Sequence, residues 1–140
     1  MTPFGEKMRK LRMERGVTLK QMADEIGVSS AYLSALEHGK RGRPGWHLIQ
    51  RILSFFNIIW DEAEEVIRLA RISHPRITID TSGLNPKATE LANRLADEIA
   101  RLEAATLDEI LVIIERRRSK TLAAGSPSDA ARRRRSVRTG

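Results

Sequence analysis

The chain has 140 residues, a length that allows one ordinary domain or one small domain with an appendage. Hydrophobic residues make up 41 % of the chain, which is enough for a core. Cysteine is absent, which excludes disulfide scaffolds, thiolate zinc sites and cysteine nucleophiles and fits a reducing cytosol. No apolar run approaches the ~18 residues of a membrane span, and the N-terminus lacks the apolar stretch of a signal peptide, so we expect a cytoplasmic protein.

A formal net charge of +7 favours an anionic partner, and this charge is unevenly distributed along the chain. Residues 1–45 carry nine Lys and Arg against five Asp and Glu. Residues 46–115 carry seven against twelve, and residues 116–140 carry nine against one. A basic head and a basic tail around an acidic middle indicate nucleic acid as the partner of the ends and protein as the partner of the middle.

The first part of the chain predicts three short helices in succession. Apolar residues recur at helical spacing, and Gly16 ends the first helix. Thr18 can cap a second helix, which Gly27 stops in a left-handed conformation. Ser29 caps a third helix, and Gly39 ends it.

Two further helices are predicted after a short basic loop. The fourth has an apolar stripe formed by Trp46, Ile49, Ile52, Leu53 and Phe56. The fifth runs from about Trp60 to Ile72, and its inward residues are Ala63, Val66, Ile67 and Ala70. These five helices define a predicted first domain, residues 1–73.

The periodicity changes at Pro75, which disfavours helix at the residue before it. Residues 76–80 alternate polar and apolar side chains, as in a short β-strand, and Thr81–Gly83 is a turn. Asn85 as N-cap and Pro86 as first helical residue then begin a helix, whose apolar face is Leu91, Leu95, Ile99 and Leu102.

A capping-box sequence at Thr106–Glu109 predicts a break near residues 104–106 and a last helix from Leu107 to about Arg118. The segment 74–118 is therefore a second predicted region, made of a short strand plus helices. From residue 119 to residue 140 large apolar residues are almost absent, so we expect a disordered basic tail. Its arginines are a predicted non-specific DNA anchor: Arg132, Arg133, Arg134, Arg135 and Arg138.

Two short helices on a three-residue glycine turn, inside a basic lobe, are typical of a helix-turn-helix. Residues 5–62 resemble the DNA-binding domain of the XRE family, which includes the phage Cro and repressor proteins. The matching features are Met22-Ala23, Gly27-Val28-Ser29, Leu33-Ser34, Glu37 followed by Gly39, and Arg43-Pro44. The resemblance implies an all-α protein with a lambda-repressor-like domain of five helices and a role in gene regulation.

The third helix is the predicted recognition helix, because a helix fits the major groove and the residues near its start reach base edges. Its small, uncharged face lies opposite Leu33 and Leu36. The predicted base-contacting residues, chosen from this face and from the resemblance, are Ser30, Ala31, Tyr32, Ser34 and Ala35. The structural alternative is that Ser30 only helps to cap the helix. Because the face lacks Arg and Gln, we expect DNA shape and water to contribute to recognition.

The predicted contacts to the DNA backbone come from Lys40, Arg41 and Arg43, which in the family's loop lie along the phosphates. The alternative is an ordinary solvated loop. The sequence departs from the family at Leu19, where the family usually places a phosphate-contacting Gln. Either of two neighbouring residues is a candidate to replace it, Thr18 and Lys20.

Arg12 and Glu37 match a family pair that forms an ion pair between the first and third helices. We interpret this pair as structural. Removing one partner of a partly buried pair leaves a charge without compensation.

Residues 74–118 are predicted to hold a homodimer together. A five-residue strand needs a partner, and the same strand of a second copy would supply one in a ribbon across the twofold axis. The helix that follows would cover this ribbon and meet its own mate. The predicted interface residues are Ile77, Ile79, Leu91, Leu95, Ile99 and Leu102. The alternative is an extended linker whose isoleucines dock on the fifth helix.

The sequence therefore predicts a sequence-specific, nucleoid-associated transcriptional regulator on double-stranded DNA. We expect a dimeric repressor that reads a palindromic operator with the helix Ser30–His38. The alternative is a DNA-binding antitoxin whose C-terminal helices bind a partner toxin.

Enzyme chemistry is not expected. The histidines stand without a partner at metal-ligand spacing, and neither a phosphate-binding glycine loop nor a nucleophile constellation is present, so we predict no metal, cofactor or catalytic residue. An acidic cluster is more typical of a solvated helix face, although RNA polymerase is a candidate partner for it: Asp61, Glu62, Glu64 and Glu65.

Overall fold

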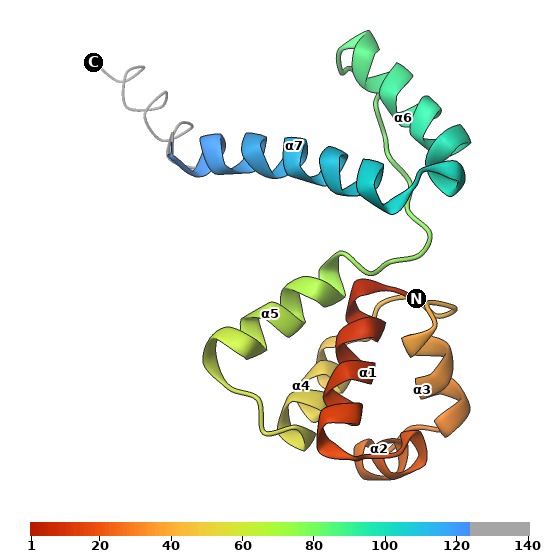
Figure 1. Ribbon diagram of the computed structural model, residues 1–140, viewed down its shortest axis with the longest axis vertical. Coiled ribbons are helices and arrows are strands. Elements are labelled where there is room, and N and C mark those ends of the chain that lie inside the picture. The colour runs from red at the N-terminus through yellow and green to blue at the C-terminus, as the bar shows by residue number, and fades with distance from the viewer. Residues whose placement is uncertain (124–140) are drawn as a thin grey trace. The chain divides into compact units, whose positions relative to one another are not determined.

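The computed structural model describes residues 1–123, and within this range every regular element is helical (Figure 1). The chain divides into two compact units, Met1–Thr78 and a second unit that begins at Ile79. The first holds α1 (Pro3–Arg15), α2 (Leu19–Ile26), α3 (Ser30–Glu37), α4 (Trp46–Phe55) and α5 (Trp60–Arg71). The second holds α6 (Pro86–Glu98), the 3₁₀ turn η1 (Ile99–Arg101) and α7 (Ala104–Ala123).

The ends of the helices in the first unit confirm the predicted capping signals. Gly16 and Gly27 end α1 and α2 in the left-handed region, with φ of 63° and 76°. Thr18 accepts a hydrogen bond from the backbone N–H of Gln21, whose side chain accepts one from the N–H of Thr18 in return. Ser29 caps α3, because its Oγ accepts from the third helical N–H at 3.0 Å. Local hydrogen bonds therefore mark where these helices begin and end.

The core of the first unit is formed by apolar residues from all five helices. Its fully buried side chains are Phe4, Met8, Met22, Leu33, Ile52, Phe56 and Val66. One member of the predicted stripe on α4 is wrong: Trp46 is 57 % exposed. Trp46 is the first residue of α4, one turn before Ile49, and Ile49 is the first residue of this helix that is buried in the core.

Two close approaches in the first unit have no signal in the sequence pattern. The Oγ of buried Ser73 accepts from the backbone N–H of Phe4 at 2.8 Å and donates to the carbonyl of Leu69 at 2.5 Å. This joins the start of α1 to the end of α5. On the same helix, a Cβ added to Gly5 would lie 2.1 Å from the carbonyl oxygen of Glu37, so α1 and α3 pack as closely as only glycine permits.

The predicted strand at residues 76–80 is wrong for the single chain, since residues 1–123 contain no strand. Alternation of side chains is not sufficient, because a ladder also requires a second backbone. The turn that follows is present: the Asp80 carboxylate accepts from the N–H of Ser82, and Gly83 has φ of 74°. Hydrogen bonding from Ser82, first through its side chain and second through its backbone N–H, lowers the pKa of Asp80.

The helices of the second unit differ from the prediction at the end of α6, at the start of α7 and at the end of α7. Asn85 and Pro86 do begin α6, but α6 ends at Glu98, so Ile99 and Leu102 do not continue its face as one α-helix. The predicted cap at Thr106 is wrong, because α7 already begins at Ala104 and the N–H of Leu107 bonds to the carbonyl of Glu103.

The helix α7 also continues to Ala123, five residues beyond Arg118, where the helix is predicted to end. The reason is that Lys120 and Leu122 are good helix formers, which extend a helix already in progress. The remainder of the predicted tail, with its five arginines, lies outside the described residues.

Candidate nucleic-acid interface

The helix-turn-helix is formed by α2, the turn Gly27–Ser29 and α3 (Figure 1). The backbone N–H groups of Gly27 and Val28 both bond to the carbonyl of Ala23 at 3.0 Å, which closes the C-terminus of α2. Val28 packs against the core, and α2 and α3 contact each other directly. The guanidinium of Arg51 on α4 donates to the carbonyl of Ile26 at 3.3 Å and so supports the end of α2. The turn is therefore held by its own backbone and by a neighbouring helix.

The recognition helix α3 has one buried face and one face open to solvent. Leu33, Leu36 and Glu37 are buried. Among the predicted base-contacting residues, Ser30 and Ala31 are exposed, and the other three are half-buried: Tyr32, Ser34 and Ala35. The helix ends at Glu37, one residue before the predicted His38, which is its C-cap.

Capping of α3 is performed by Ser29 and not by Ser30. The Ser29 hydroxyl accepts the cap hydrogen bond from the N–H of Tyr32, and Ser30 is the first helical residue. The alternative role considered for Ser30, that of a cap, is thus taken by its neighbour. Contact between Ser30 and a base remains a prediction.

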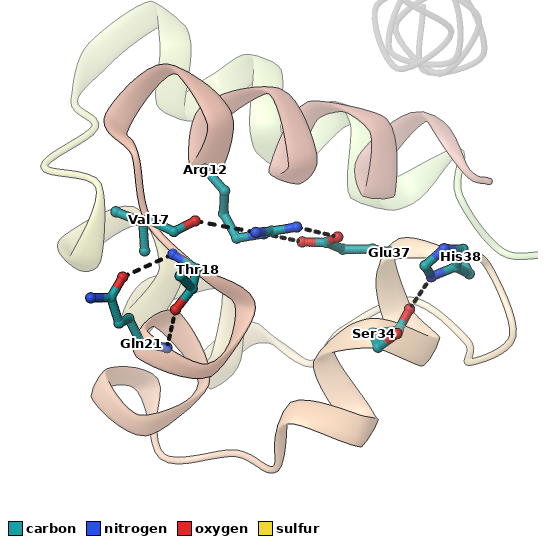
Figure 2. Close-up of polar contacts among 7 residues, drawn as sticks. All are labelled: Arg12, Val17, Thr18, Gln21, Ser34, Glu37 and His38. Atoms are coloured by element: carbon teal, nitrogen blue, oxygen red, sulfur yellow. Dashed lines mark hydrogen bonds and ion pairs between the residues drawn. The ribbon is translucent and has the colours of Figure 1, made fainter.

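An ion pair fixes α3 against α1 (Figure 2). The Nε of Arg12 lies 2.7 Å from one carboxylate oxygen of Glu37, and its Nη2 lies 3.0 Å from the other. A third guanidinium nitrogen donates to the carbonyl of Val17 at 3.2 Å. Glu37 is only 2 % exposed. The hydrogen bond to Glu37 raises the pKa of Arg12, and the charge attraction adds to it against the lowering effect of burial. The pair is bidentate and joins the two helices that the resemblance implied.

The basic loop after α3 places its three charged side chains in solvent. Lys40, Arg41 and Arg43 are all exposed. The guanidinium carbon of Arg41 lies 5.9 Å from the centre of the Tyr32 ring, within the range of a cation–π contact. One predicted backbone contact therefore lies beside one predicted base contact. The arrangement leaves these charges available to phosphates, and such contacts remain predictions.

The N-terminus of α2 explains the departure from the family at Leu19. This side chain is half-buried and packs against the core, so it offers nothing to a phosphate. Thr18 and Lys20 are both exposed beside it. The Thr18 oxygen already accepts the cap hydrogen bond from Gln21, and its hydroxyl proton is still available to donate (Figure 2).

Two structural contacts in the first unit were not predicted from the sequence. Gln21 completes the capping box with Thr18, and its spacing of three residues was a sufficient signal. Lys7 on α1 lies 3.4 Å from Glu62 and 3.5 Å from Glu65, so half of the acidic cluster on α5 is paired within the chain. That contact joins distant segments, and no spacing rule predicts it.

The predicted dimer residues all follow Ser73 in the chain, and none of them is buried within the single copy. Ile77, Ile79, Leu91 and Ile99 are exposed. The other two, Leu95 and Leu102, are half-buried. Their role in a dimer remains a prediction.

Neither a metal cluster nor a membrane-spanning helix occurs in the part of the chain that the structure describes. Residues 1–123 contain no group of three or more His, Asp or Glu side chains arranged to hold a metal ion. Over the same residues, no helix has both the length and the apolar character needed to cross a bilayer.

Comparisons with known proteins agree with this geometry. RghRB of Bacillus subtilis, an uncharacterized HTH-type transcriptional regulator, is 38 % identical over 61 residues, which span 44 % of each chain. The HTH-type transcriptional repressor RghR of the same organism is 41 % identical over 61 residues, 44 % of this chain and 45 % of RghR. The HTH-type transcriptional activator BcrR of Enterococcus faecalis is 37 % identical over 70 residues, 48 % of this chain and 34 % of BcrR.

The match spans less than half the length of each of these relatives. A family model described as a helix-turn-helix domain matches residues 3–74, just over half of the chain. These residues lie within the first unit and include all of its five helices. The chain belongs to this helix-turn-helix domain family.

Proposed function

We propose that this protein is a sequence-specific DNA-binding transcriptional regulator, and that it acts as a dimeric repressor on a palindromic operator. The observation that carries the proposal is the exposed start of α3. Ser30 and Ala31 face solvent at the end of a well-braced turn, while Leu33 and Leu36 anchor the other side of the helix. A helix held in this way can enter the major groove with its first turn against the bases.

Electrostatics supports the same proposal. Lys20 before α3 and Lys40, Arg41 and Arg43 after it are exposed on the unit that carries the recognition helix. Phosphate contacts of this kind supply affinity and position, while base contacts supply specificity. A short, uncharged reading face with basic flanks is therefore expected to bind DNA firmly and to read few bases directly.

The test is a footprint of the purified full chain on genomic DNA, followed by variants. Replacing Ser30→Glu and Ala31→Glu together should lower affinity for the protected site about 100-fold or more, since both reading positions change and two negative charges face the groove. The matched control is Gln50→Glu with Ser54→Glu, which adds the same charge at exposed positions of α4. An unchanged footprint with the α3 variant would show that α3 is not the reading helix.

The salt dependence of binding tests the basic loop. Replacing Lys40, Arg41 and Arg43 by Ala should reduce the slope of log affinity against log salt by about one for each phosphate that the loop no longer neutralises. The preferred base sequence should stay the same. A change in base preference with an unchanged slope would assign the loop to the bases instead of the phosphates.

A homodimer is supported by the state of the second unit. None of residues 74–121 is buried, although this segment contains many large apolar side chains. Such a segment lacks a core of its own, and a second copy would supply the missing contacts and place two recognition helices about one DNA turn, ~34 Å, apart. Sedimentation of the full chain and of a fragment ending at Thr78 tests this, with a dimer expected only for the full chain.

The absence of buried residues in 74–121 also favours a second candidate function, that of a DNA-binding antitoxin whose C-terminal helices bind a partner toxin. If another protein covers the exposed helices of the second unit, the full chain should sediment as a monomer and dimerise neither alone nor on DNA. A dimeric full chain with a twofold-symmetric footprint favours the repressor.

A further inference from the structure

The helix α7 carries a continuous apolar run that is not buried within the described chain. Leu111, Val112, Ile113 and Ile114 are between 47 % and 63 % exposed. Leu107 and Ile110 precede them and are only half-buried. An exposed apolar surface of this extent on a helix indicates a site of protein association.

The apolar side chains of α7 form one face of several residues, and Val112 and Ile113 lie outside this face. Four of them follow a spacing of three, one and three residues and so share one face, which we name the α7 stripe: Leu107, Ile110, Leu111 and Ile114. Glu109 and Arg116 lie on the opposite face of the same turns. The stripe extends along two helical turns with the spacing of a helix–helix seam.

The two ends of α7 differ in the sign of their charge. The N-terminal part carries Asp108 and Glu109, and the C-terminal part carries a basic group after a single Glu115: Arg116, Arg117, Arg118 and Lys120. Two such helices side by side in parallel would place the basic ends together. An antiparallel pair instead separates the two basic ends, and it aligns the two helix dipoles favourably.

We propose that α7 pairs with α7 of a second copy of this chain in antiparallel orientation through the α7 stripe. In the register that covers the whole stripe, Leu107 packs against Ile114 of the second copy, and Ile110 packs against Leu111 of the second copy. The same register brings Glu103, just before α7, next to Arg118 of the second copy. The apolar contacts and this single pair of opposite charges thus agree on one alignment.

This inference rests on the homodimer of the proposed function and adds, within the predicted dimerisation region 74–118, a surface that the predicted interface residues do not include. It does not involve the recognition helix. If α7 does not pair, contact between α3 and the bases can still be detected by the footprint. If α3 does not bind DNA, the pairing of α7 can still be detected in the free protein.

Disulfide cross-linking tests the orientation, because the chain has no cysteine of its own. Full-length Leu107→Cys and Ile114→Cys proteins, one with a tag that changes its mass, are mixed and oxidised. In the proposed pair the two positions face each other, so the mixed product should dominate. Each variant alone should cross-link poorly, because equal positions are offset by about seven residues, roughly 10.5 Å along the axis, beyond the Cα separation of about 7 Å that a disulfide tolerates.

The matched control is the pair Glu109→Cys and Arg116→Cys, which has the same spacing on the opposite face and should give little product. Three results would overturn the proposal. Self-linked Leu107→Cys and Ile114→Cys without mixed product would mean a parallel pair. Efficient linking only in the control pair would mean a different face. A monomeric full chain at micromolar concentration would exclude pairing of the stripe with a second copy.

A second measurement tests whether the stripe itself forms the seam or whether any exposed apolar residue of α7 contributes equally. Ile114→Glu should weaken the dimer of the full chain at least tenfold by analytical ultracentrifugation, since each copy would then place a carboxylate in the seam. Ile113→Glu alters the adjacent residue, which is similarly exposed but lies off the stripe, and should change the dissociation constant by less than threefold. Equal effects of the two variants would overturn the assignment of the seam.

Discussion

The ion pair between Arg12 and Glu37 makes a quantitative prediction about folding. We consider Arg12→Met, which keeps an unbranched side chain but removes the cation. Glu37, which is 2 % exposed in the intact protein, then loses the bidentate partner of its carboxylate. Removing one partner from a buried pair costs about 3–5 kcal/mol, which is a large share of the ~5–15 kcal/mol that stabilises a small domain.

The reverse change is expected to cost less. In Glu37→Met the guanidinium of Arg12 keeps its hydrogen bond to the carbonyl of Val17, and its side chain is 15 % exposed against 3 % for Glu37, so water can reach it. The double variant leaves no stranded charge and should be close to neutral. The predicted order of destabilisation is therefore Arg12→Met, then Glu37→Met, then the double variant.

Urea unfolding of the full chain, followed by circular dichroism, measures these free energies. With a slope of about 1.5 kcal/mol per molar, a destabilisation of about 3 kcal/mol lowers the midpoint by about 2 M. If Arg12→Met costs less than about 1 kcal/mol, the pair behaves as a solvated surface bridge. That result would refute the reasoning from burial.

Three further predictions concern backbone positions. Gly5→Ala should destabilise the first unit by about 1–3 kcal/mol, because its Cβ would lie 2.1 Å from the carbonyl oxygen of Glu37. Ser73→Ala should cost about 1–3 kcal/mol, since the buried N–H of Phe4 is left without an acceptor. Trp60→Gly should stabilise the chain by up to about 1 kcal/mol, because Trp60 has φ of 55° and is 81 % exposed, so its side chain contributes little packing. Urea midpoints measure all three, and each change has a control in the same unit. Gly45→Ala adds a Cβ where no atom lies within 4 Å, and Ser54→Ala removes an exposed hydroxyl, so both should leave the midpoint nearly unchanged. Asn57→Gly relaxes a φ of 52° that asparagine already tolerates, and its gain should be smaller than that of Trp60→Gly. If a control changes the urea midpoint as much as its test variant does, the cause stated for that variant is wrong.

The helix boundaries of the first unit could be predicted because capping is local. Thr18 and Gln21 are three residues apart, and Gly27 ends its helix with a bond to the carbonyl of Ala23 in the same helix. The same local signal failed at Thr106, since a helix that begins earlier has the same periodicity and gains the bond between Leu107 and Glu103. Periodicity therefore identifies a helix better than it identifies its first residue.

Long-range contacts could not be predicted from spacing. The hydrogen bond between Phe4 and Ser73 joins residues 69 positions apart, and the charge of Lys7 meets its partners only because α1 and α5 pack together. The ion pair of Arg12 and Glu37 was accessible only through the family resemblance. At the interface itself, the sequence indicated which face of α3 is exposed, whereas contact with bases depends on DNA that the chain alone does not define.

The hydrogen bond from Phe4 to Ser73 has a consequence for how the first unit can be used as a module. The first helix of this unit begins and its last helix ends at two points joined by that bond, whose nitrogen and oxygen lie 2.8 Å apart. A protein fused before Pro3 and one fused after Ser73 would therefore emerge from the same spot. Joining the two ends with a short linker and opening new termini in a surface turn should also be tolerated, because adjacent termini are the condition that circular permutation requires.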